Sequence, residues 1–245
     1  MLYTRHEISK MRSFDMFHVE YSVQKQISNF MYAVYAWVAV GLAAAAATAY
    51  AIASSPAFFL TLRQNPLLMI GIFIGQIALV MVFSGMIHRM NFAVAMALFL
   101  ILTASYGVTF SAILYVYTTA SVLATFITTA ATFAVMAVYG YMTRSDLTSI
   151  GSMAMTILFG MIIAMVVNIF LQSQAFNIII SGIGVVIFTL LIAYDAQKIK
   201  RIGQEMLYHN EALNKVALLG AFTLFLDFIN LFLFLLQFLG RRRDQ

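Results

Sequence analysis

The chain has 245 residues, of which 63% are hydrophobic and only 9% are charged. Soluble domains carry about 25% charged residues, so this composition excludes an ordinary soluble globular protein. Cysteine is absent, which excludes disulfides and thiolate metal sites. The formal net charge is +5, but the basic residues lie in tails and connections, where they indicate membrane orientation rather than nucleic-acid binding.

Taken in chain order, the sequence predicts an all-α membrane protein with seven transmembrane helices. Residues 1–29 mix both charges and lack the apolar stretch of a signal peptide, so we expect a cytoplasmic N-terminal tail. Seven apolar segments follow, each near the ~20 residues that span a bilayer. Residues 30–240 thus form one membrane domain, and residues 241–245 form a short basic C-terminal tail. The predicted spans are residues 30–53, 66–88, 92–115, 121–142, 150–171, 175–196 and 216–239.

The distribution of Lys and Arg predicts the orientation. With the N-terminus inside, the cytoplasmic pieces hold ten basic residues, whereas the outer connections hold only Arg63. This excess favours a cytoplasmic N-terminus and an outside C-terminus. The basic run 241–243 departs from the positive-inside rule, because seven spans place these residues outside. Either the tail follows the earlier spans, or residues 216–239 re-enter and return to the cytoplasm; their full spanning length favours the first alternative.

Small residues spaced four apart predict where helices approach closely. Gly71 with Gly75 in the second span, and Gly160 with Ala164 in the fifth, have this spacing. Such pairs let two helix backbones come together in a membrane. These residues, and the alanine run from Ala43 to Ala47 in the first span, therefore allow close helix approach.

Two aspartates interrupt the apolar spans. Asp195 ends the run 176–193, and Asp227 lies within 216–239. An ionisable side chain at membrane depth is costly, so each marks a candidate functional site. Asp227 also belongs to a polar stripe, which should face the bundle interior or a water-filled cavity. The stripe shares one helical face and comprises Gly220, Thr223, Asp227, Asn230 and Gln237.

Sequence spacing alone does not establish that the two carboxyl groups meet. Asp227 lies roughly 15 Å inside the membrane from Ala217, whereas Asp195 lies only about 5 to 8 Å from the basic residues after it. Direct contact requires those lysines to snorkel, or a local distortion. Arg89, at the inner end of the second span, has the right depth to pair with Asp195. It is equally explained as an ordinary positive-inside anchor.

The residues around the two aspartates resemble the signature stretches of the transmembrane Bax inhibitor motif family, in its bacterial branch. Residues 193–199 read Ala-Tyr-Asp-Ala-Gln-Lys-Ile, and residues 226–232 read Leu-Asp-Phe-Ile-Asn-Leu-Phe. Residues 75–80 and 139–143 are similar to that branch as well. The resemblance covers nearly the whole chain from about residue 20. It implies a seven-helix bundle with the last helix central, in a bacterial inner membrane.

The resemblance also implies a pH-sensitive calcium leak. In that picture Asp195 and Asp227 share a proton and bind the ion, and Arg89 is the latch on one of them. Thr223, Tyr194 and Asn230 are the supporting polar residues. Calcium is then a transported ion rather than a cofactor, and we expect neither another cofactor nor a transition-metal site. The four histidines, which have no ligand spacing, are His6, His18, His88 and His209.

Two other classes compete with a channel. Aspartyl intramembrane proteases carry Tyr-Asp on one helix, which Tyr194-Asp195 matches, and Gly-x-Gly-Asp on the next. Asp227 follows Leu-Phe-Leu, and no proline follows Pro66 for the Pro-Ala-Leu element, so we expect no enzyme. The third class is an interaction protein that modulates a membrane-embedded quality-control protease, a role attributed to some bacterial relatives. Residues 1–29 would then bind the protease. The other expected partners are the lipid bilayer and calcium ions.

Overall fold

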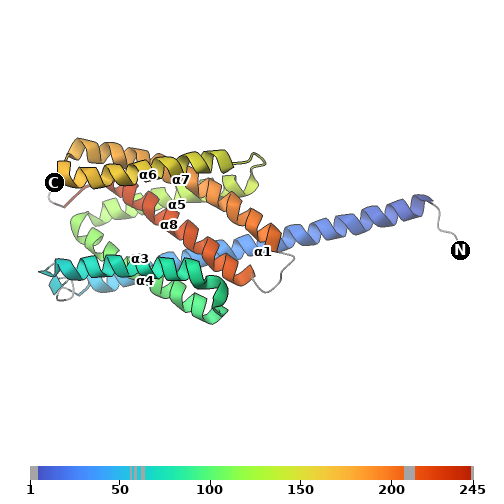
Figure 1. Cartoon of the computed structure of the whole chain (residues 1–245), viewed down its shortest axis with the longest axis horizontal. Coiled ribbons are helices and arrows are strands. Elements are labelled where there is room, and N and C mark those ends of the chain that lie inside the picture. Colours follow the sequence, from blue (N-terminus) through green and yellow to red (C-terminus); the bar gives the residue numbers. More distant parts are fainter. Residues whose placement is uncertain (1–4, 56, 58–59, 62–63, 207–212, 244–245) are drawn as a thin grey trace.

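The computed structural model describes residues 5–55, 57, 60–61, 64–206 and 213–243, and its regular elements there are helices (Figure 1). Arg63, which the orientation argument uses, and His209 lie outside the described residues, as do the last two residues of the predicted tail. The elements are α1 (Arg5–Ala53), α3 (Pro66–Met86), the short 3-10 helix η1 (Ile87–Arg89), α4 (Phe92–Val116), α5 (Thr119–Met142), α6 (Thr148–Leu171), α7 (Gln174–Met206) and α8 (Leu213–Leu239).

Within the described part of the chain, seven helices are long and apolar enough to cross a membrane, which confirms the predicted all-α, seven-helix fold. Most helix ends fall within a few residues of the prediction. Two helices are longer: α1 already begins at Arg5, and α7 continues to Met206. The prediction followed apolar side chains, but a helix needs only its backbone hydrogen bonds. Lys, Arg, Gln and Glu are good helix formers, so both helices continue through polar residues.

Side chains cap the first turns of two helices. The Asn91 side chain accepts a hydrogen bond from the Val94 amide at 2.9 Å at the start of α4. The Thr118 hydroxyl accepts one from the Ser121 amide at 3.3 Å at the start of α5. Pro66 begins α3, where its missing amide proton costs nothing. Each cap satisfies amides that would otherwise be unpaired near the membrane.

Helix α8 is the centre of the bundle, as the resemblance implied. In its most apolar window 72% of the residues are buried, compared with at most 39% in any other span of the described chain. It contacts α1, α4, α5, α7 and η1, and Figure 1 shows it (red) crossing between the α3–α4 pair and the α6–α7 pair. Aromatic rings fill its interfaces edge to face. These ring pairs include Phe83–Phe222, Tyr106–Phe225, Phe126–Phe228 and Phe133–Phe228.

The glycines of the second and fifth spans do not make the close approach that their spacing allows. A Cβ at Gly71, Gly75 or Gly160 would meet no atom within 4 Å. These residues belong to α3 and α6, the least buried spans, so the small residues face away from other helices. The close approaches occur elsewhere: a Cβ at Gly107 would overlap the carbonyl oxygen of Ala45 on α1. The spacing of small residues thus indicated an allowed contact face, but not whether a helix lies there.

The two ends of the chain lie at opposite ends of the molecule. The first turns of α1 project beyond the bundle, and the C-terminus lies at the far side (Figure 1). Helix α8 is continuous from Leu213 to Leu239, and residue 241 then bonds to the α4–α5 link, where the Thr118 amide donates to the Arg241 carbonyl at 3.1 Å. This arrangement fits a full seventh crossing and not a re-entrant last segment.

Candidate functional site

The structure brings the two aspartates together. The carboxyl groups of Asp195 on α7 and Asp227 on α8 lie close enough to act on each other, and both line the same cavity. The Asp227 side chain is only 6% exposed, whereas Asp195 is partly buried. A hydrogen bond between two carboxyl groups needs one proton, so this placement would allow the two aspartates to share a proton.

The register of α7 against α8 explains how the pair overcomes the difference in depth. A Cβ at Gly220 would lie 2.9 Å from Ile199, and the Ser181 hydroxyl donates to Gln237 at 2.7 Å. In this antiparallel register Asp195 lies opposite a point on α8 that is about one turn before Asp227. Side chains lean toward the N-terminus of their own helix, so in antiparallel helices the two carboxyl groups lean toward each other.

The signature residues around Asp195 fix the rotation of α7 against α5 and α6. A Cβ at Gly140 of α5 would overlap the Ala193 carbonyl oxygen, so only glycine lets the two helices approach this closely. The Tyr194 ring packs on the bare backbone of Gly151 of α6, with the Lys198 ammonium 5.6 Å from the ring centre. Tyr194, predicted as a supporting polar residue, therefore contributes a packing surface.

Gln197 is a positioning residue that the sequence reasoning missed. Its side-chain oxygen accepts from the Leu147 amide at 2.9 Å, and its nitrogen donates to the Ser145 carbonyl at 2.8 Å. Both groups lie in the α5–α6 link, so one side chain ties α7 to that link two residues from Asp195. The position of Gln197 in the sequence already indicated such a role. A glutamine near the membrane surface needs hydrogen-bond partners, and the backbone groups of a nearby loop can supply them.

Asp146 strengthens the same link from outside the membrane spans. Its carboxylate accepts from the Thr148 hydroxyl at 2.6 Å, the Thr148 amide at 3.0 Å and Arg201 at 3.2 Å. These bonds, those from Thr148 above all, lower the pKa of Asp146 to about 2. The carboxylate is therefore ionised at physiological pH, and the C-terminal part of α7 stays tied to the start of α6.

Adding a methyl group at Gly140 should disturb this arrangement. We expect Gly140→Ala to lower the free energy of unfolding by about 1–3 kcal/mol, because the backbone of α7 must move away from α5. Gly160→Ala is the matched control, since its Cβ meets nothing within 4 Å. Thermal unfolding of both purified variants in the same detergent measures the difference, and equal melting temperatures would contradict the close contact.

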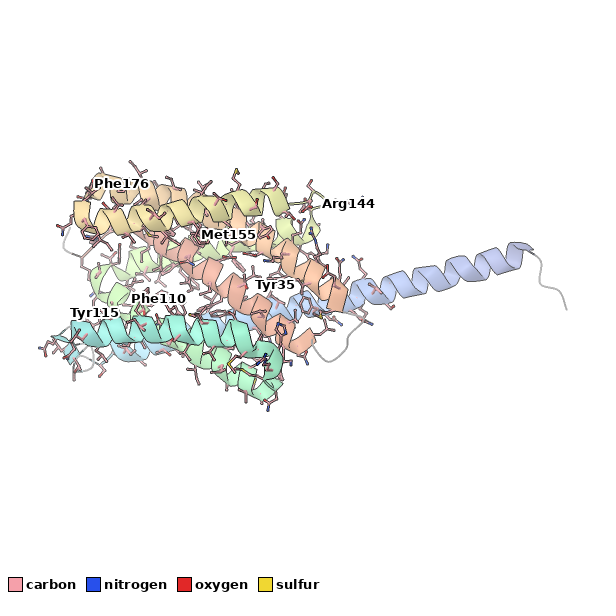
Figure 2. All side chains as sticks on the ribbon, in the orientation of Figure 1. Tyr35, Phe110, Tyr115, Arg144, Met155 and Phe176 are labelled. Atoms are coloured by element: carbon pink, nitrogen blue, oxygen red, sulfur yellow. The ribbon has the colours of Figure 1, made fainter. Side chains whose placement is uncertain are left out.

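A cavity of about 420 Å³ lies beside the aspartate pair, between α3, α6, α7 and α8. We call it the aspartate cavity. Its α6 wall carries Met155, Met161 and Met165, which are flexible side chains able to adapt to changes in shape. Figure 2 labels Met155 on α6, where its side chain is exposed. The polar residues that line the aspartate cavity are Ser84, Asp195, Thr223, Asp227 and Asn230.

The polar stripe predicted on the last helix is therefore divided between two surroundings. Thr223, Asp227 and Asn230 line the aspartate cavity. Gly220 and Gln237 instead face α7, and the Gln237 amide donates to Asn177 at 2.9 Å while accepting from Ser181. Asn177 and Ser181 were not singled out from the sequence, since lone polar residues near a helix start have many local explanations.

One oxygen of the pair has no partner. Among the described residues, Asp227 Oδ2 is the buried side-chain polar atom that lacks a hydrogen bond. Thr223 does not supply one, because its hydroxyl donates to the Leu219 carbonyl of its own helix at 3.2 Å. An unpaired carboxylate oxygen in a buried site calls for an explanation, and a bound ion or proton is one.

Arg89 is not part of the pair in this structure. It lies exposed in η1, and Lys215 of α8 holds the flanking main chain by donating to the His88 and Met90 carbonyls at 3.1 and 3.2 Å. The charged groups that act on Asp195 are Lys198 and Asp227. Among the described residues, no group of three or more His, Cys, Asp or Glu is placed to hold a metal ion.

Comparisons with known proteins agree with this architecture. A family model described as "Inhibitor of apoptosis-promoting Bax1" matches residues 27–244. The inner membrane protein YbhL of Escherichia coli is 42% identical over 218 residues, covering 89% of this chain and 93% of YbhL. An uncharacterized protein of Borreliella burgdorferi is 41% identical, covering 89% of this chain and 94% of its own, and one of Caulobacter vibrioides is 36% identical, covering 95% and 96%.

The family match spans most of the chain and includes both aspartate stretches, which here form one site between α7 and α8. The seven apolar helices with α8 at their centre are the fold that the resemblance implied. The chain is therefore a multi-pass membrane protein that belongs to the transmembrane Bax inhibitor motif family.

Proposed function

We propose that this protein is a pH-sensitive cation leak channel, with calcium as the ion, in which the Asp195–Asp227 pair is both pH sensor and ion site. The observation that supports this proposal most is that the two carboxyl groups lie close together and line one cavity between helices of the membrane domain. A structural pair would be expected in a closed, fully satisfied site. Here Asp227 Oδ2 lacks a partner, which leaves coordination capacity for a cation.

The pair responds to pH because two neighbouring carboxylates cannot both ionise without strong repulsion. Two unit charges 4 Å apart repel by about 4 kcal/mol at an effective dielectric constant of about 20, enough to shift a two-state equilibrium about a thousandfold. With one shared proton, α7 and α8 stay packed at this point. Loss of that proton near neutral pH pushes the carboxylates apart and creates a doubly negative site that attracts a cation.

Calcium suits such a site because it prefers oxygen ligands and tolerates irregular carboxylate geometry. The two carboxylates supply the charge, and the Asn230 side chain, one turn from Asp227 on the cavity wall, adds a carbonyl oxygen. Water completes the coordination. With only two acidic ligands, calcium is held weakly, as conduction requires.

The shape of the aspartate cavity supports a conduction path. Along α8 its lining extends from Phe222 to Phe234, which is roughly 18 Å of the bilayer thickness. The hydrocarbon core is about 30 Å thick, so the cavity covers more than half of it. Within the cavity, Ser84, Thr223 and Asn230 supply polar groups beside the pair.

Arg89 remains the predicted latch of a second state. In the structure described here Lys198 is the cation that acts on Asp195. If Arg89 latches Asp195 when the helices rearrange, Arg89→Ala should raise basal calcium leak, while Arg144→Ala, at an exposed arginine of the α5–α6 link, should not. Equal leak in both variants would leave Arg89 as an orientation anchor.

The proposal is tested by calcium flux through the purified protein in liposomes. Wild type should conduct above neutral pH at least about tenfold faster than Asp227→Asn, because the amide cannot carry the negative charge that attracts the ion. Asp146→Asn is the matched control, since Asp146 lies outside the membrane spans. Equal flux in wild type, Asp227→Asn and empty liposomes would overturn a channel function.

We place the protein in a bacterial inner membrane, where its relative YbhL is located by name, with the N-terminus in the cytoplasm. The chain has no cysteine, so single cysteines report topology without background. A membrane-impermeant maleimide added outside the cell should label Gln174→Cys at the α6–α7 link and not Ser145→Cys at the α5–α6 link. The reverse pattern would invert the orientation.

One observation favours the second candidate, an interaction protein that modulates a membrane-embedded quality-control protease. Helix α1 begins at Arg5, although its candidate membrane span begins only at Tyr21, and Figure 1 shows these first turns projecting from the bundle. A protruding helix is a natural contact element for a partner. Deleting residues 5–20 should then change substrate degradation by the protease while calcium flux stays at the wild-type level; unchanged degradation would argue against this role.

A further inference from the structure

The basic C-terminal tail is bonded to the link between α4 and α5. Residues 117 and 242 form an isolated antiparallel bridge, and the Arg243 amide donates to the Val116 carbonyl at 3.0 Å. The Arg241 amide also donates to the Ser121 hydroxyl at 2.9 Å. Main-chain groups make these bonds, so the arginine side chains are not needed to hold the tail in place.

The three arginines present a concentrated positive charge at this end of the bundle. Arg241, Arg242 and Arg243 are all exposed, and Arg243 Nε donates to the Tyr117 carbonyl at 3.1 Å. The ion pair found among the described residues, Arg201–Asp146, lies in the region of Arg144 at the other end of the molecule (Figure 2). Within the described part of the chain, the tail arginines therefore have no carboxylate partner.

An apolar pocket of about 320 Å³ lies near the tail, at the start of α5. Ser121 bonds the tail, and the next residue, Val122, already lines the pocket. The pocket lies between α1, α4, α5 and α8, and Phe110, which lines it, lies toward this end in Figure 2. Its rim includes Tyr50 and Leu123, which are 73% and 57% exposed, so the pocket opens onto the outer surface of the bundle.

The depth of the pocket matches the acyl region of a bilayer. Val122 lies three residues after the start of α5, roughly 5 Å from the end of the span. Phe228, the deepest residue on α8, lies eleven residues before Leu239, roughly 17 Å from that end. The arginines thus lie at the depth of a lipid headgroup, and the apolar pocket lies at the depth of its acyl chains.

We propose that this end of the bundle is a binding site for one anionic phospholipid. Its phosphate lies against Arg241 and Arg242, and part of one acyl chain fills the apolar pocket. Guanidinium groups match phosphate geometry with paired donors, and basic residues at the membrane surface attract anionic lipids. The site also gives the arginines, which depart from the positive-inside pattern, a function on their own side of the membrane.

Binding of a fluorescent phosphatidylglycerol to the full-length protein in detergent tests this proposal. Arg241→Gln together with Arg242→Gln should weaken binding about tenfold or more, because two charges near the phosphate are removed. Arg144→Gln, at the opposite end, should leave it unchanged. Ala46→Phe, which fills the pocket, should also weaken binding about tenfold, whereas Ala47→Phe should not, since both alanines are exposed but only Ala46 lines the pocket.

Competitors separate the sources of the phosphate. Unlabelled phosphatidylglycerol should displace the probe, while phosphatidylcholine with the same chains and soluble glycerol phosphate should not. Displacement by glycerol phosphate would indicate a site for free phosphate and overturn a lipid site. Equal binding of the two lipids, or equal loss in Ala46→Phe and Ala47→Phe, would also overturn it. None of these measurements depends on calcium flux.

Discussion

Replacing Asp227 with leucine should make this protein more stable while it abolishes the pH response. Burying a carboxyl group with one unpaired oxygen costs about 1–3 kcal/mol. Leucine removes that cost and the repulsion with Asp195, and the adjoining cavity of about 420 Å³ accepts the larger side chain. Asp195 is not left alone, because it is partly exposed and keeps Lys198 as a favourable neighbour.

Thermal unfolding of Asp227→Leu in detergent, measured above neutral pH, checks the sign of this effect. We expect a gain of about 1–3 kcal/mol in the free energy of unfolding. Asn230→Leu is the control, since Asn230 lines the same cavity but cannot ionise, and its stability should change little. A less stable Asp227→Leu would mean that the pair holds α7 and α8 together for structural reasons.

Calcium affinity should fall steeply as the solution becomes more acidic. Calcium binds the deprotonated carboxylates, so a proton and the ion compete for the same oxygen atoms. If binding displaces one shared proton, affinity drops about tenfold for each pH unit below the titration of the pair. Titrating the purified protein with calcium at a series of pH values measures this slope.

Single amide variants define which groups carry that slope. Asp195→Asn and Asp227→Asn should each bind calcium more weakly and with little dependence on pH, because no shared proton remains. Asp146→Asn should keep the wild-type slope. Its carboxylate has a pKa of about 2 and is already fully ionised where the pair titrates. A wild-type slope in both pair variants would place the ion elsewhere.

Most of the fold could be predicted from the sequence because a membrane imposes one strong rule: apolar segments of fixed length must be helices. The positions of the two aspartates were therefore known to within a turn. Their contact could not be derived from spacing. It depends on the register of α7 against α8, which Gly220 and Ser181 set, and on the lean of side chains in antiparallel helices.

The partners of small and polar residues were the hardest to predict. Gly71 and Gly160 have the spacing of packing residues yet face no helix, whereas Gly140 receives the backbone of α7. Gln197 and the C-terminal arginines likewise gain their roles from links that lie far away in the sequence. A sequence pattern indicates which contacts a helix face allows, whereas the arrangement of the helices determines which of these contacts form.

The central claim is that one protonation event, shared by Asp195 and Asp227, controls the leak. Its most direct test is calcium flux against pH in liposomes for wild type, Asp195→Asn, Asp227→Asn and the double variant. Wild-type flux should rise as pH increases through neutrality, and all three variants should show flat profiles, with the double variant no flatter than either single one. If either single variant keeps the wild-type pH profile, the pair is not the gate.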